Sequence, residues 1–320
     1  MEKKKEASEV RKYYNNDDSG KVFLLVIVFQ ILISLVISLL IGQISSNYNI
    51  KTEDITSSTW YILASALINI LVYGLVYFLY TSSNRIDFNA VKFNYKLKWH
   101  TFLVVILVGV IALFGSQYFV GAVDDLLAAL GYPLDSASPI ALVDFGSFMF
   151  AVFVLAIVPA VFEELIFRGI VFNGLCKRFK TSSAIILSAL LFALFHGNLQ
   201  QFIYPFILGM IMAWIVARTG SVVCSMIIHF INNFIVVLFA YLSTISNFSI
   251  DFPRTWWGYL IAFELLLLMG AILFLIDRFY FKRKDKEIIE RENKTSNFLY
   301  IAFAVSGLLL LITTVLKFSI

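Results

Sequence analysis

Long apolar runs separated by short polar segments are the dominant pattern of this chain. Runs of roughly 17–25 apolar residues match the thickness of a bilayer core. Nine such runs lie near residues 22–42, 60–80, 101–123, 148–175, 182–197, 201–217, 221–245, 257–276 and 298–318, the fifth and sixth being short. The pattern predicts an all-α integral membrane protein, a polytopic bundle of eight or nine transmembrane helices.

Composition agrees with this interpretation. Of the 320 residues, 60% are hydrophobic and 14% are charged, whereas a soluble domain carries about 25% charged residues. The net charge of +4 is small, so we expect the lipid bilayer and no nucleic acid as a partner. No internal repeat, Gly-rich phosphate loop or separate soluble domain is visible in the sequence.

The basic residues predict an orientation. If the N-terminus is cytoplasmic, 21 of the 25 Lys and Arg residues fall on the inner side, seven of them between Arg278 and Lys294. The outer side then receives only Lys51, Arg254 and Lys317. An excess of basic residues marks cytoplasmic loops. We therefore expect an uncleaved polar tail over residues 1–20 and a multi-pass protein of the cell membrane.

Three ionisable residues interrupt the fourth apolar run together. From residue 148 the chain reads FMFAVFVLAIVPAVFEELIFRGIVFNGL, which contains Glu163, Glu164 and Arg168. Charge at membrane depth is costly unless it is paired or wetted, so such residues are functional candidates by default. Glu164 and Arg168 are four residues apart and can form an ion pair on one helix face. Glu163 points about 100° away and could serve another partner.

Two later apolar runs carry further polar residues. His196 ends one run, and His229 and Asn233 lie one helical turn apart on another. Measured from the inner ends of straight helices, Glu163, His196 and Asn233 lie at about 20–22 Å and His229 at about 14 Å. Phe192 precedes His196 by one turn and could wall a common site. Small residues that would let the helices approach closely are Ala156, Ala160, Ala189 and Ala193.

These residue types fit peptide hydrolysis. A carboxylate in a partly desolvated pocket can take a proton from water near neutral pH. A histidine can share that water or protonate the leaving amine. A neutral imidazole and an amide can donate hydrogen bonds to the oxygen that becomes negative. Simpler explanations remain open for single residues: intramembrane His and Asn often only join helices, and a Glu–Arg pair can merely stabilise one helix.

Taken in order, the motifs resemble the CPBP group of intramembrane proteases, which includes the CAAX prenyl endopeptidases and the bacterial immunity or Abi proteins. The resemblance covers about residues 148–240 and rests on Glu163, Glu164, Arg168, Phe192, His196, His229 and Asn233. It implies an all-helical core with a central intramembrane catalytic cavity open to the cytoplasm. It also implies endoproteolysis of a membrane-associated peptide or protein, near the membrane-associated end of that substrate.

The resemblance further implies residue roles. Glu163 and His196 would activate water, His229 and Asn233 would stabilise the oxyanion, and Glu164 with Arg168 would orient and charge-balance the site. The expected organisation is a tail over 1–20, transmembrane helices over 21–147, a catalytic core over 148–245 and C-terminal transmembrane helices over 246–320.

The need for a metal is a separate question. Two His and one Glu match the ligands of catalytic zinc sites, which makes Glu163, His196 and His229 an alternative Zn²⁺ site. The histidines do not share one helix, however, and Asn233 beside His229 suits an oxyanion donor better than a metal neighbour. We therefore expect a metal-free mechanism with no cofactor required.

Two non-proteolytic functions compete with this interpretation. The first is a non-catalytic immunity or scaffold protein that binds a peptide or partner in the membrane. The second is a transporter, for which buried ionisable groups are also expected. The sequence lacks the paired interrupted helices that secondary transporters show, so the transporter is the weaker alternative.

Overall fold

The computed structural model describes residues 11, 13–56, 58–93, 97–134, 142–246, 255–281 and 292–318. Within these ranges the fold is helical and contains no β-sheet, apart from an isolated bridge between Arg11 and Ile86. Several of the basic residues used to predict the orientation lie outside the described residues. These are residues 1–10 and 12 of the polar tail, Lys96, Arg254 and the segment 282–291.

Among the described residues, seven helices are long and apolar enough to cross a membrane, and two shorter apolar helices lie between them. The long ones are α2 (Asn16–Tyr48), α4 (Thr59–Ser83), α5 (Trp99–Ala129), the composite helix Phe145–Arg178, α11 (Val222–Ser246), α12 with its extension η4 (Trp256–Leu275 and Ile276–Tyr280), and α13 (Asn297–Phe318). The shorter two are α9 (Thr181–Phe195) and α10 (Ile203–Thr219). All nine predicted runs are therefore helices, which confirms the predicted fold class.

The structure adds elements that the hydropathy pattern did not predict. A short helix α3 (Thr52–Thr56) follows α2, and a 3₁₀ turn η1 (Phe88–Val91) follows α4. Helix α2 also begins at Asn16, inside the predicted tail. Asp18 near its start is buried. Its carboxylate accepts two hydrogen bonds of 3.1 Å from Arg11 and one of 2.8 Å from the Tyr80 hydroxyl. These contacts fix the start of α2 against α4.

The composite helix Phe145–Arg178 carries the three charged candidates and is not a uniform α-helix. It consists of α6 (Phe145–Ala151), the π-helical segment η2 (Val152–Ile157), α7 (Val158–Glu164), a second π-helical segment η3 (Leu165–Phe172) and α8 (Asn173–Arg178). Pro159 follows the first π segment and has no N–H to give to the carbonyl of Leu155. π segments are rare and often occur at functional sites. The two here flank the Glu163–Glu164 pair.

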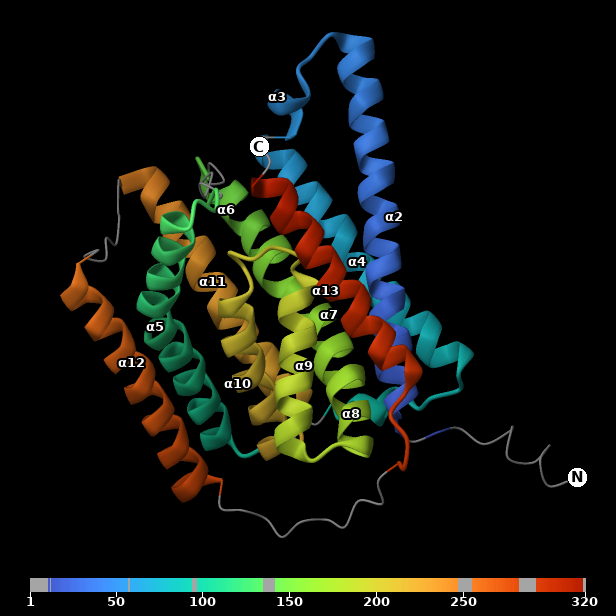
Figure 1. The fold of residues 1–320 in the computed structure, drawn as a ribbon, viewed down its shortest axis with the longest axis vertical. Coiled ribbons are helices and arrows are strands. Elements are labelled where there is room, and N and C mark those ends of the chain that lie inside the picture. Colours follow the sequence, from blue (N-terminus) through green and yellow to red (C-terminus); the bar gives the residue numbers. More distant parts are fainter. Residues whose placement is uncertain are drawn as a thin grey trace, which may run out of the picture.

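The composite helix lies inside the bundle, where α2, α4, α9 and α11 surround it (Figure 1). Helix α10 packs against α9 and α11, while α5 and then α12 form one edge of the molecule. The four alanines predicted at close approaches are all buried. A side chain at Gly209 of α10 would meet the Ala189 backbone of α9 at 3.2 Å, so these two helices touch closely.

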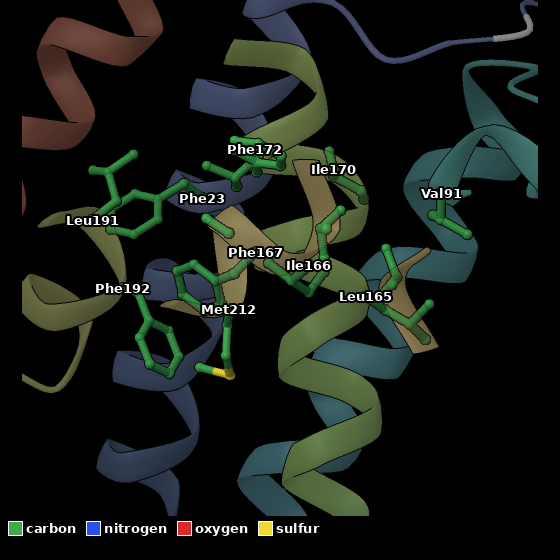
Figure 2. Close-up of a cluster of buried hydrophobic side chains, with 14 of the residues drawn as sticks. Phe23, Val91, Leu165, Ile166, Phe167, Ile170, Phe172, Leu191, Phe192 and Met212 are labelled. Carbon is green, nitrogen blue, oxygen red and sulfur yellow. The ribbon is translucent and has the colours of Figure 1, made fainter. Parts of the chain in front are cut away.

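A cluster of buried apolar side chains holds η3 in place (Figure 2). The Phe167 ring lies edge-on to Phe23 of α2 at 6.2 Å and to Phe192 of α9 at 4.9 Å between ring centres. Met212 of α10 lies in the same cluster. Buried aromatic side chains contribute strongly to packing energy. The cluster therefore fixes the helical turn that carries Arg168 against α9.

Candidate functional site

Glu164 is the centre of a buried charged chain. One of its oxygens, Oε1, accepts a hydrogen bond of 2.7 Å from Nη1 of Arg168 and lies 3.0 Å from Nδ1 of His229. The exposed fractions of these residues are 0% for Glu164, 1% for Arg168 and 4% for His229. The ion pair predicted from the four-residue spacing is thus present. A residue from α11 completes it, which ties the fourth and seventh apolar runs together.

The contact with Glu164 fixes which proton His229 carries. Glu164 is paired with Arg168 and a carboxylate oxygen only accepts, so Nδ1 of His229 is the hydrogen-bearing nitrogen. The other nitrogen, Nε2, faces Oε2 of Glu163 at 4.0 Å. Glu163 therefore has the different partner that its position on the helix predicted. The two adjacent glutamates contact opposite sides of one imidazole ring.

Arg168 is held on three sides. Besides Glu164, it donates through Nη2 to the carbonyl oxygen of Gly209 at 3.2 Å. Its guanidinium also lies 4.4 Å from the centre of the Phe192 ring, a cation–π contact that gains strength when desolvated. Because these partners come from α9 and α10, Arg168 joins both short helices to the charged chain. Sequence reasoning did not find Gly209, since a carbonyl acceptor leaves no pattern in the sequence.

His196 lies at the end of α9. Its Nδ1 is 2.8 Å from the carbonyl oxygen of Phe192, so Nδ1 carries hydrogen and Nε2 of the neutral ring holds a lone pair. The Phe192 ring lies 5.0 Å from the His196 ring and 6.1 Å from the His229 ring. Phe192 therefore contacts both imidazoles, the place that the sequence predicted for it.

Asn233 lies on α11 one turn after His229 and reaches the first π segment. Its Nδ2 donates to the carbonyl oxygen of Leu155 at 3.0 Å, the carbonyl that Pro159 leaves without its usual helical donor. Its Oδ1 accepts from Asn232 at 3.0 Å, and Asn232 in turn accepts from the Tyr204 hydroxyl. The amide thus has a structural task, in addition to the oxyanion role that remains a prediction.

Two aromatic hydroxyl residues near the site were not predicted. Tyr73 of α4 is buried and lies edge-on to Phe195, the neighbour of His196, at 5.6 Å between ring centres. Tyr204 of α10 reaches the amides through Asn232. Both residues lie in apolar runs where tyrosine is common, so nothing in the sequence distinguished them. Their positions extend the site from three predicted helices to five.

The donor atoms were tested for their fit to a zinc ion. The alternative zinc ligands are Glu163, His196 and His229. Both histidines use Nδ1 on other partners, so only their Nε2 atoms could face an ion. Within the described ranges, no group of three His, Cys, Asp or Glu side chains is close enough to share one ion. As placed, the residues do not fit the zinc alternative, so we derive no step through a metal.

The predicted cavity open to the cytoplasm stays a prediction. A surface pocket of about 510 Å³ lies elsewhere, where the start of α2 meets the segment before α13. None of the candidate residues lines it. Its lining is Asn15, Asn16, Asp17, Glu292, Asn293, Lys294, Thr295, Ser296 and Asn297.

Comparison with known proteins points to the same segment. The family described as "Type II CAAX prenyl endopeptidase Rce1-like" matches residues 145–235. The UPF0177 protein YxdF of Lactococcus lactis subsp. lactis (strain IL1403) is 30% identical over 78 residues, 24% of this chain and 42% of that protein. "Putative membrane peptidase YdiL" of Bacillus subtilis (strain 168) is 27% identical over 128 residues, 40% of this chain and 52% of that protein.

The chain thus spans about half the length, or less, of these curated relatives. No solved structure matches it. The family match begins at the first residue of the composite helix and ends two residues after Asn233. It therefore contains every candidate residue of the site. Residues 145–235 thus form a domain of the Rce1-like type II CAAX prenyl endopeptidase family.

Proposed function

We propose that this protein is an intramembrane endopeptidase that hydrolyses a peptide bond of a membrane-associated peptide or protein. The observation that supports this most strongly is the buried chain from Arg168 through Glu164 to His229, with Glu163 on the far side of the same imidazole. An ion pair that only joined helices would not need a second carboxylate beside the histidine.

In the proposed reaction, water is activated between Glu163 and His196. The water oxygen forms a bond to the substrate carbonyl carbon while its proton passes to the Glu163 carboxylate. The carbonyl oxygen becomes negative and accepts hydrogen bonds from Nε2 of His229 and the Asn233 amide. The C–N bond then breaks, and the proton is delivered to the leaving nitrogen. The products are a carboxylic acid, which then ionises, and an amine, and Glu163 is again a carboxylate.

The geometry restricts the protonation state of His229 in this step. Nδ1 already uses its hydrogen on Glu164, so Nε2 can donate only if it carries a second proton. The oxyanion donor would then be an imidazolium, not the neutral ring that the sequence suggested. A cation at this position lies between two glutamates, and Arg168 balances the second one. Glu164 and Arg168 therefore act as positioning residues in the proposal.

We propose that residues 148–245 are the catalytic core and that the reaction needs no metal. The helices before and after this core would complete the membrane bundle. We further propose that the N-terminus is cytoplasmic in the cell membrane, on the strength of the basic residues. Cysteine labelling tests this orientation, with Ser58→Cys after α3 and Asn84→Cys after α4. Labelling of position 84 from outside the cell would reverse the assignment.

Comparative proteomics of cells that carry the wild type or Glu163→Gln tests the function. We expect membrane-associated fragments that depend on the wild type and disappear with Glu163→Gln, His196→Ala and His229→Ala. Acid–base groups typically contribute about 10²–10⁴-fold each. Glu53→Gln is the matched control, because Glu53 is an exposed carboxylate on α3. A phenotype that persists in Glu163→Gln would favour the non-catalytic immunity or scaffold function instead.

A further inference from the structure

A second intramembrane carboxylate lies far from the site described above. Glu264 is on α12, eight residues after Trp256 and thirteen before Asp277, about 12 and 20 Å along a helix. It is exposed on the surface of the bundle. Among the residues that the structure describes, none forms a hydrogen bond or ion pair with Glu264. A bare carboxylate at that depth is costly and marks an interaction site by default.

The side chains around Glu264 form a regular seam. Exposed residues recur at alternating spacings of four and three, the repeat of helices that pack along a common axis. The seam consists of Trp257, Ile261, Glu264, Leu268, Ala271 and Leu275. Another face of α12, about 120° around the helix from the seam, is already occupied, because Gly258, Ala262 and Met269 are buried and Met269 would meet a side chain at Gly115 of α5 at 2.9 Å. Helix α12 lies at the edge of the bundle (Figure 1), and the seam residues are exposed there.

We propose that this seam is the contact surface between two copies of the chain, with the two Glu264 side chains hydrogen-bonded to each other at its centre. Copies inserted with one topology place α12 in parallel, and a two-fold axis brings equal positions together. A second copy thus always presents a carboxyl group at the depth of the first. Two neutral carboxylic acids can each donate one hydrogen bond and accept another.

Neither α12 nor the helix on which it packs supplies a basic partner for Glu264. Helix α12 carries no Lys or Arg before Arg278, and α5, the helix on which it packs, carries none. The basic residue inside the bundle, Arg168, is buried against Glu164. A neutral acid pair satisfies both groups without a cation. A single polar residue in an apolar seam also fixes the register of the two helices, and hydrogen bonds of this kind join helices in membranes.

Disulfide cross-linking in membranes tests the seam. Cys176 and Cys224 are free and are first replaced by serine. Leu268→Cys, one turn from Glu264, should form a disulfide-linked dimer on oxidation. Phe263→Cys is the control, since it is equally exposed but lies about 140° around the helix from Leu268. Adding Glu264→Leu to Leu268→Cys should lower the dimer fraction about 3- to 30-fold, whereas Glu264→Gln should keep it within about 2-fold because an amide also donates and accepts.

Three results would overturn the inference. The first is cross-linking of Leu268→Cys no faster than that of Phe263→Cys, and the second is a dimer fraction that Glu264→Leu leaves unchanged. A disulfide between Leu268→Cys and a different protein would assign the seam to another membrane partner. Energy transfer between labelled copies, diluted stepwise with lipid, provides a second readout that does not depend on thiol chemistry. Proteolysis plays no part in either measurement, so the seam can fail while the proposed function stands.

Discussion

Replacing Arg168 by Met tests how the charged chain is held together. The substitution keeps an unbranched apolar stem but removes the guanidinium group and its charge. Glu164 would then be a carboxylate with 0% exposure that has lost its ion pair. Removing one partner of a buried pair costs about 3–5 kcal/mol, mainly because the remaining charge is uncompensated. The carbonyl oxygen of Gly209 would lose its donor as well. A buried acceptor without a partner typically costs a further amount of about 1–3 kcal/mol in stability.

The structure also supplies a partial compensation. His229 still lies 3.0 Å from the same Glu164 oxygen and can accept a proton in response. We therefore expect a loss of about 3–5 kcal/mol in the free energy of unfolding, not the sum of both penalties. The double variant Glu164→Gln with Arg168→Met should recover at least half of this loss, because a charge is no longer stranded.

The assay is equilibrium unfolding in detergent of the wild type, both single variants and the double variant. Arg168→Lys is a useful fourth variant, since it keeps the charge but cannot reach Glu164 and Gly209 with a rigid fork. A loss below about 1 kcal/mol in Arg168→Met, or a double variant less stable than either single one, would refute the reasoning. The first result would mean that Glu164 is neutral or solvated in the native protein.

Two further predictions concern the amide and the metal. Asn233→Ala should lower the catalytic rate by about 10²–10³-fold, because the amide stabilises the oxyanion in the proposal. It should also lower the free energy of unfolding by about 1–3 kcal/mol, because the Leu155 carbonyl loses its donor. A loss of stability with full activity would leave Asn233 with a structural role alone. Active purified protein should contain well under one zinc ion per molecule and keep its activity in chelator. Activity that is lost to chelation and restored by zinc would overturn the metal-free proposal.

The apolar runs were sufficient to predict the helices because a membrane span must be apolar along nearly its whole length. The nine runs correspond to nine helices even where the runs were short. What hydropathy does not encode is the hydrogen-bond pattern inside a span. The π segments on either side of α7 therefore escaped prediction, and only Pro159 hinted at the first of them.

The separation of two residues in the sequence predicted contacts within one helix of the site but not contacts between helices. The Glu164–Arg168 pair followed directly from four residues of separation. The contact of His229 with both glutamates needed the packing of α11 on α7, for which the sequence offered only approximate depths and the family resemblance. Gly209, Tyr73 and Asn232 contribute backbone, aromatic or amide groups that have no distinctive pattern in an apolar run.

Glu264 shows a different kind of omission. It was visible in the sequence as a single carboxylate inside the eighth run, yet it matched no family motif and drew no prediction. Its meaning depends on whether it points into the bundle or away from it, and one helix in isolation does not determine that. The exposed position on α12 supplied the missing information.

The contact between Asn233 and Leu155 has a consequence for how the protein is made. Synthesis proceeds from the N-terminus, so the fourth span leaves the ribosome well before the seventh. During that interval Arg168 can already pair with Glu164, because both lie in one helix. Glu163 has no histidine beside it yet, and the carbonyl freed by Pro159 has no amide. The fourth span therefore gains its contacts with His229 and Asn233 only when α11 packs against it. A chain that stops after α10 would leave this span for quality control to recognise.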